Sequence, residues 1–485
     1  MSWKSTFCAT IAAIALVAQV RADEGNSPAP KIIELKEVSL VGMTAKGEVQ
    51  WIEKGIDLGD FQRGYPVYGQ REPDESTRYP AFATEDVWYG TLQIGAWRDS
   101  DKLSAAIAIT KSARDVERCD LLYVDTDFDG DLTDETPSRT TEDERETILL
   151  PNYWRSTGDD QIIIHFKPVT LDLPEQYPLR PYTVYPFIVK GTAKIDDEEQ
   201  EYLSLFYRRP TAMTGKASLF GKKYTVMLGE LSVGTYESPT TTILLGTEDG
   251  QRGGSHYEKR LGWLRYEDGR FWEFSASPDG SRLKVAPCTG AMGVLRLSAG
   301  DRSFEEVTMR GYISSKTRAV PLGDVDNRGE YGGFEASREC RLPVGDYMPS
   351  WVTLNYGNLR LFVSESYHSD GKPRDSTRQR HYAIQIREDK PFVFDFSDEP
   401  DVLFALPGKD AEFKPGDKVE VKPVLYVPAL DMMIRNVYDT QEKVEKTETF
   451  GDQTSTYKTD KSLDPTVVIR NSQGEVMAEG TAPFG

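Results

Sequence analysis

The stretch LRYEDGRFWEF, from Leu264 to Phe274, decides the fold class of this chain. Apolar and polar residues alternate on both sides of Asp268-Gly269, a dipeptide that favours the tight turn of a two-residue β-hairpin. The chain then runs on to Val285 through a second turn signal, Pro278-Asp279-Gly280. We therefore predict two consecutive antiparallel hairpins in this region.

The same alternation recurs along most of the sequence, which predicts an all-β protein with several β-sandwich-like domains in tandem and little helix. No segment sustains an apolar 3.6-residue period over about ten residues. Thr140–Thr147 is predicted to be a short exposed helix or a loop. Further strands are predicted at Gln161–Phe166, Tyr224–Leu228, Thr241–Leu245, Arg360–Val363, His381–Ile386, Phe392–Phe396 and Val419–Val427.

The N-terminus has the features of a secretory signal peptide over residues 1–22. A charged start at Lys4 precedes an apolar run from Phe7 to Val20 and a small-residue cleavage site before Asp23. The run is shorter than the roughly 20 apolar residues that a membrane span needs. We therefore predict export with cleavage, no membrane insertion of the mature chain, and a secreted, periplasmic or cell-surface location.

Turn signals and polar stretches divide the rest of the chain into four predicted units. The first, 31–200, carries an acidic loop, and the second covers 201–335. A small unit at 336–400 and a last unit at 401–485 follow. The number of units agrees with the length of the chain, because 485 residues are too many for one hydrophobic core.

The charge balance restricts the partners. The chain has 78 acidic residues against 58 lysines and arginines, a net charge of −20. Cleavage after residue 22 removes Lys4 and Arg21 and no acid, so the charge becomes −20 − 2 = −22. A surface this acidic repels nucleic acid and anionic lipid and suits divalent cations or neutral partners. We predict no nucleic-acid partner and leave the oligomeric state open.

Signals of catalysis are missing from the sequence. The mature chain keeps Cys119, Cys288 and Cys340, which have no CxxC spacing and form at most one disulfide, so spare thiols are the simplest expectation. The histidines have no metal-ligand spacing, and no nucleophile elbow or phosphate-binding loop is present. The sequence therefore assigns no catalytic residue and no organic cofactor. The histidines are His165, His256, His368 and His381.

The stretch LLYVDTDFDGDLTDETP, Leu121–Pro137, is the motif that carries chemistry. At a separation of about 5 Å each pair of carboxylates costs roughly 1 to 3 kcal/mol. A hard cation with several oxygen ligands, above all Ca²⁺, offsets that cost. We therefore predict a calcium site here. Its candidate ligands are Asp125, Asp127, Asp129, Asp131, Asp134 and Glu135.

The spacing matches the first half of an EF-hand-like calcium loop, with Asp125, Asp127 and Asp129 at positions 1, 3 and 5 and Gly130 at 6. Asp131 at position 7 is expected to bind through its backbone carbonyl. Position 12 is Thr136, so the closing ligand stays open between Asp134 and Glu135. An ordinary acidic turn is the alternative interpretation. A weaker second candidate is Asp324–Glu330, where Arg328 stands at a ligand position.

Three blocks carry a resemblance to known proteins. LYVDTDFDGDLTDE (122–135), LPVGDY (342–347) and the last residues, 463–485, resemble a group of large secreted bacterial proteins of unknown function. That resemblance implies export, calcium loops and β-sandwich modules, and no reaction. LPVGDY is also similar to transthyretin-like or carboxypeptidase-regulatory-like modules, which are usually non-catalytic. The turn Phe413–Asp417 and the strands after it resemble an immunoglobulin-like domain.

Two functions are compatible with these features. The first is a secreted, calcium-stabilised, non-catalytic β protein with a binding or structural role outside the cell, its partner a glycan or a cell-surface or matrix polymer. The second is a secreted hydrolase of polysaccharide or another polymer with accessory β modules. A deep cleft in residues 31–335 with two or more convergent acids, or a histidine and an acid, away from Asp125 would favour the hydrolase. A flat aromatic strip without such a cleft would favour binding.

Overall fold

The computed structural model contains strands and no helix in its described residues, which confirms the all-β class. No helix able to cross a membrane occurs in that part of the chain. The predicted signal peptide and the candidate Asp324–Glu330 lie outside it. The described residues are 28–40, 67–95, 102–143, 162–195, 198–230, 233–247, 257–267, 269–298, 307–322, 339–364, 382–395, 400–408, 411–412, 418–450, 453–471 and 473–482.

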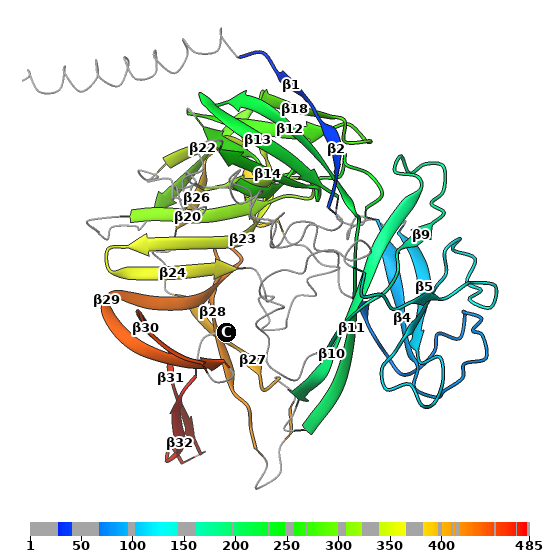
Figure 1. The fold of residues 1–485 in the computed structure, drawn as a ribbon. Coiled ribbons are helices and arrows are strands. Elements are labelled where there is room, and N and C mark those ends of the chain that lie inside the picture. The colour runs from blue at the N-terminus through cyan, green and yellow to red at the C-terminus, as the bar shows by residue number, and fades with distance from the viewer. Residues whose placement is uncertain are drawn as a thin grey trace, which may run out of the picture.

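A first sandwich, residues 67–208, lies on the right in Figure 1. Two antiparallel sheets pack their apolar faces into a shared core. One sheet has the order β4-β5-β6-β7, and the other has the order β3-β11-β10-β8 with β9 beside β10. The strands are β3 (Val67–Tyr68), β4 (Trp88–Ile94), β5 (Leu103–Thr110), β6 (Leu121–Val124), β7 (Ser138–Arg139), β8 (Ile162–His165), β9 (Val169–Leu171), β10 (Tyr182–Ile195) and β11 (Glu198–Arg208).

A second sandwich lies at the top of Figure 1 and combines residues 31–39 with 211–287. Its sheets have the orders β1-β18-β17-β16 and β15-β14-β13-β12-β2, and its core is continuous with that of the first sandwich. The strands are β1 (Lys31–Glu34), β2 (Lys36–Ser39), β12 (Thr211–Leu219), β13 (Lys222–Gly229), β14 (Thr242–Thr247), β15 (Tyr257–Arg260), β16 (Arg265–Glu267), β17 (Arg270–Ala276) and β18 (Arg282–Pro287).

The two hairpins predicted from the deciding stretch are confirmed. Strand β16 pairs with β17, and β17 pairs with β18, both antiparallel. Gly269 and Gly280 occupy the turns with φ of 77° and 76°, a region that favours glycine. Strand β18 alternates buried and exposed residues, so its apolar face enters the core as the sequence pattern requires.

A third sandwich encloses the second large core. Its small sheet has the order β22-β19-β26, in which β19 and β26 run parallel, and it faces part of a nine-stranded sheet. The strands are β19 (Met292–Ser298), β20 (Val307–Ser314), β21 (Ala319–Pro321), β22 (Glu339–Pro343), β23 (Gly345–Tyr356), β24 (Leu359–Ser364), β25 (Ile384–Ile386), β26 (Phe392–Asp395), β27 (Asp401–Leu406) and β28 (Lys422–Val427).

Two ribbons complete the described fold. Strands β29 (Met432–Phe450) and β30 (Gln453–Ser462) extend the nine-stranded sheet. Strands β31 (Thr466–Arg470) and β32 (Val476–Thr481) form a separate two-stranded sheet, seen at the bottom of Figure 1. Nearly all side chains of this last hairpin are exposed, so it adds little to either core.

Strand pairing crosses the predicted boundaries between units. Strands β1 and β2 of the predicted first unit pair with β18 and β12 of the second. Strand β20 pairs with β23 across residue 335, and β24 pairs with β29 across residue 400. Turn signals mark only where a strand ends, whereas sheet membership depends on partners far away in the sequence. The sheets therefore do not follow the divisions at 200, 335 and 400.

Candidate metal site

The acidic loop, residues 125–135, connects β6 to β7 at the end of a buried strand. The backbone N–H of Asp125 still donates to Ala106 O of β5, at 2.9 Å. The Asp125 side chain is only 1% exposed. The pairing of β6 with β5 therefore continues to Asp125 and places the first carboxylate of the loop inside the protein.

Two residues with positive φ turn the chain within the loop. Gly130 has a φ of 80°, which glycine adopts without strain, and Phe128 has a φ of 66°, which is rare for a bulky residue. The ring of Phe128 packs against the first core, and this packing offsets the local strain. The sequence Asp127-Phe-Asp129-Gly thus folds as a tight turn with one apolar anchor.

Main-chain hydrogen bonds fix the loop on two sides. Arg78 N donates to Gly130 O at 2.9 Å, and Leu132 N donates to Arg78 O at 2.8 Å. On the other side, Asp172 N donates to Thr126 O at 2.8 Å. The loop is therefore held in one conformation by segments that lie far from it in the sequence.

Leu132 anchors the outer side of the loop. Its side chain is fully buried on the outer face of the β4-β5-β6 sheet, in a small apolar cluster. Aromatic rings surround that cluster, with edge-on contacts between Tyr79 and Tyr89 and between Phe82 and Tyr123. This packing ties the loop to the sheet without using any carboxylate.

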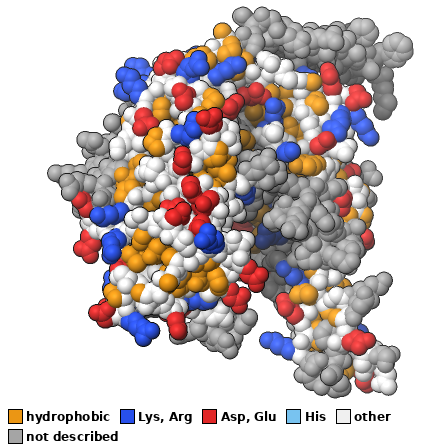
Figure 2. Space-filling view, turned by 90° about the vertical axis from the view of Figure 1, so that its right-hand side faces the viewer, with side chains coloured by type: hydrophobic (Ala, Val, Ile, Leu, Met, Phe, Trp, Pro, Cys, Tyr) orange, Lys and Arg blue, Asp and Glu red, His pale blue; other side chains and the backbone are white. Residues whose placement is uncertain are grey.

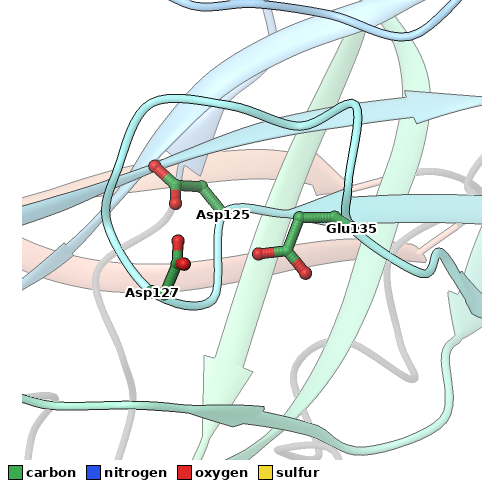
Figure 3. A group of neighbouring side chains, drawn as sticks. All are labelled: Asp125, Asp127 and Glu135. Carbon is green, nitrogen blue, oxygen red and sulfur yellow. The ribbon is translucent and has the colours of Figure 1, made fainter.

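Three carboxylates converge inside the loop. Oxygen atoms of Asp125, Asp127 and Glu135 all lie within 4.8 Å of one another. Figure 3 shows the three side chains pointing toward one another from the two ends of the loop. The side chains change from buried (Asp125) to half-buried (Glu135) to exposed (Asp127), so the cluster opens toward solvent.

Backbone donors orient these carboxylates. Asp125 accepts hydrogen bonds from Asp129 N and Gly130 N, both at 3.1 Å. Glu135 Oε1 accepts from Thr126 N at 2.5 Å, and the Thr126 hydroxyl donates to the same carboxylate. Each side chain is thereby held before any cation arrives, which lowers the entropy cost of binding one.

The electrostatics of the cluster fit a cation. Burial raises the pKa of the Asp125 carboxyl, although the Gly130 N–H and other backbone donors oppose that rise. In the described residues, no lysine or arginine forms an ion pair with Asp125, Asp127 or Glu135. An all-oxygen donor set with excess negative charge suits Ca²⁺.

The structure separates the six candidate ligands into two groups. Asp125, Asp127 and Glu135 come together, whereas Asp134 does not belong to this group. The Asp129 carboxylate accepts from Asp131 N at 2.7 Å, and the Asp131 carboxylate lies 2.5 Å from Arg78 Nη1. The sequence spacing could not reveal the Arg78 contact, because Arg78 is far from the loop in the sequence. That contact engages the Asp131 carboxylate, and the Asp131 carbonyl stays a predicted ligand. The Asp134 side chain is exposed.

The three cysteines and the one described histidine are buried or partly buried in the fold. Cys119, Cys288 and Cys340 are free thiols, as the simplest expectation held. Burial raises the pKa of the Cys340 thiol to about 12, which makes it unreactive. His165 lies in β8 beside Phe187, and burial lowers its pKa. The other three histidines lie outside the described residues.

The described aromatic pairs differ in geometry and exposure. The stacked pair Phe187 and Phe206 is buried, whereas the half-exposed rings near the acidic loop meet edge-on. Figure 2 views the first sandwich and shows acidic side chains beside an apolar patch, with basic side chains in small separate groups. This face therefore has no broad basic surface among its described residues.

No protein-family model, curated protein sequence or solved structure matches this chain. The class defined by fold and site is thus an all-β, multi-sheet protein with a carboxylate cluster in a strand-connecting loop. The resemblance to secreted bacterial β proteins stays a prediction.

Proposed function

We propose that this protein is exported and non-catalytic, that calcium stabilises it, and that it has a binding or structural role outside the cell or at its surface. One observation carries the calcium proposal: three oriented carboxylates, one of them almost fully buried, share a small volume without a cationic partner in the described residues. Asp125, Asp127 and Glu135 would hold the ion, which would neutralise their mutual repulsion.

The geometry supports a structural rather than a sensory role for the ion. The loop joins two strands of one sheet and is fixed by Arg78 and Asp172, so no helix pair is available to open on binding. Millimolar calcium outside the cell keeps even a weak site of this type filled. A neutral glycan or matrix polymer is the partner class that agrees best with a net charge of −20.

The buried glutamate of the described residues gives no support to the hydrolase alternative. Glu230, the buried glutamate that most resembles a catalytic acid, is 1% exposed. Its carboxylate accepts hydrogen bonds from Tyr182 OH and from two backbone N–H groups. A polymer substrate could not reach it without displacing those donors.

The calcium proposal can be tested by thermal unfolding of the mature protein in calcium and in chelator. At a calcium concentration of about 100 times Kd, binding adds about 2.7 kcal/mol to the free energy of unfolding. For a folding unit of about 150 to 250 residues, that raises Tm by roughly 5 to 10 °C. The double variant Asp127→Asn/Glu135→Gln should lose that rise, because it removes two of the three charges.

The matched control is Asp279→Ala in the second sandwich. Asp279 also accepts hydrogen bonds within a turn, from Ser277 and Ser281. It does not belong to the carboxylate cluster of the acidic loop. Its calcium-induced rise in Tm should equal that of the wild type. An identical Tm of the wild type in calcium and in chelator would refute the calcium proposal.

A further inference from the structure

Two parts of the described fold expose several large apolar side chains each. In β27, three alternate residues are exposed, and the ring of Phe404 at their centre is 50% exposed. The hairpin β31–β32 exposes two such side chains on each strand, among them Met477 at 65%. Among the described side chains, every other strand has at most one. The exposed residues are Val402, Phe404 and Leu406 in β27 and Val468, Ile469, Val476 and Met477 in the hairpin.

The hairpin β31–β32 has no supporting sheet among the described residues. Its two strands pair only with each other. A two-stranded sheet alone is marginally stable at best in water, because it buries too little apolar surface. Its base is fixed nevertheless, since Ala482 N donates to Pro465 O and Leu463 N donates to Val437 O of β29. The hairpin is thus held at its base with its apolar side chains in solvent, and a partner surface would stabilise it.

Strand β27 is an end strand of the nine-stranded sheet, and in the described part of the chain it pairs only with β28. Proteins usually protect such an edge with charges, proline, bulges or very short strands. The pairing of β27 is irregular after Phe404, but the strand has six residues and a single charge, Asp401 at its start. The edge is therefore only partly protected, and its exposed residues are the apolar ones.

The charges of the two elements complement each other. Strands β27 and β28 together carry one acid and one base, Asp401 and Lys422. The strands of the hairpin also carry one of each, Arg470 and Glu479. Both elements are therefore neutral within a chain of net charge −20, so the general repulsion between two acidic copies is weakest here. Each element also offers a charge of either sign to the other.

We propose that the hairpin β31–β32 of one copy packs on β27 of a second copy, so that the chain forms a two-fold symmetric dimer. Both elements lie in the lower part of Figure 1. Each copy supplies one hairpin and one β27, so a two-fold axis repeats the contact and closes the assembly. The acidic loop lies in the first sandwich, so the dimer does not depend on the calcium proposal.

Sedimentation of the mature protein over a range of concentrations tests the dimer. Its contacts are small, so we expect a dissociation constant in the micromolar range. Phe404→Asp and Met477→Glu each place a charge in the contact and should each raise that constant at least about tenfold. Ile32→Asp is the matched control, because Ile32 is an exposed apolar residue of the end strand β1 in the second sandwich. It should leave the dissociation constant unchanged.

A wild type that stays monomeric at about 100 µM would overturn the proposal and leave the two elements to a different partner. So would an equal loss of association in all three variants, because the effect would then not be specific to the two elements.

Oxidative cross-linking between two different variants identifies the contact. Phe404→Cys chains and Met477→Cys chains are mixed, both with Cys288→Ser because Cys288 is partly exposed. We expect a disulfide that links the two kinds of chain, since one contact brings residue 404 of one copy near residue 477 of the other. Disulfides that form only between two Phe404→Cys chains would show that β27 pairs with β27, and would overturn the proposal.

Discussion

Asp125 and Glu230 are the two buried carboxylates among the described residues, and their surroundings differ in one respect. Both are 1% exposed, and both accept backbone N–H groups. Asp125 has two further carboxylates beside it, whereas Glu230 has the hydroxyl of Tyr182 and lies near the Arg209 guanidinium. The cluster at Asp125 has no cationic partner among the described residues, and the proposed calcium ion would supply one. Glu230 obtains its partners from the chain itself.

The difference shows how burial of a charge is managed in two ways. A buried carboxylate is stable only when hydrogen bonds and an opposite charge compensate it. In the acidic loop, the sequence places several acids within a few residues, and the proposed calcium ion would supply the compensating charge. Around Glu230, compensation comes from Tyr182 in β10 and from Arg209 in the connection between β11 and β12. We therefore propose that the loop responds to calcium, whereas the surroundings of Glu230 should respond to changes in the chain's own residues.

The largest effect is expected for Glu230→Ala, which leaves Tyr182 OH and two backbone N–H groups without their acceptor. Loss of one partner of a buried charged site costs about 3 to 5 kcal/mol. Chemical unfolding should show the same loss in calcium and in chelator. Glu230→Gln, which keeps an acceptor oxygen, should lose less. A loss that appears only in chelator would remove the distinction between the two sites.

A smaller effect is expected for Tyr182→Phe, which removes one hydrogen bond to Glu230 and keeps the ring. A hydrogen bond to a charged group contributes about 1.5 to 3 kcal/mol. The free energy of unfolding should fall by that amount, while the calcium-induced rise in Tm stays unchanged. Tyr356→Phe is the control, because its hydroxyl donates to Ser298 O in the third sandwich. Unaltered stability of Tyr182→Phe would contradict this role of the Tyr182 hydroxyl.

The pH dependence should separate the two carboxylates. Burial raises the pKa of both Asp125 and Glu230 in the folded protein. When folding raises a carboxyl's pKa, the protonated carboxyl favours the folded state. This contribution to stability is complete below the ordinary pKa and is lost as pH rises through the folded-state pKa. Calcium should reverse this pH dependence for Asp125 only. It binds the ionised carboxylate, so its contribution to stability grows as pH rises.

The gap in Tm between calcium and chelator should therefore widen from about pH 5 to about pH 7.5. Thermal unfolding at several pH values measures it. A gap that is constant over this range would show that calcium binds away from Asp125.

The smallest effect is expected for Arg78→Ala. The guanidinium lies 2.5 Å from Asp131 but is 75% exposed, so solvent screens the pair. The main-chain bonds between Arg78 and the loop are retained in the variant, and Tm in calcium should hardly change. A large loss would mean that Asp131 needs this ion pair to shape the metal site.

Local sequence patterns predicted the carboxylate cluster of the acidic loop but did not predict the contacts of Glu230, and the reason is physical. Asp125, Asp127 and Glu135 lie within one turn-forming stretch, so their proximity follows from short-range spacing. Glu230 stands in the sequence as an ordinary acid after a strand. Its partner Tyr182 is 48 residues away, and only the packing of two sandwiches brings them together.

The sequence by itself determined the all-β class, the hairpins from Leu264 to Val285 and the position of the acidic loop. Each depends on side-chain alternation or on turn residues a few positions apart. The tertiary structure decided which strands share a sheet, which three of six acids converge, and which glutamate joins the sandwiches. Those outcomes depend on contacts between distant segments, which local periodicity does not encode.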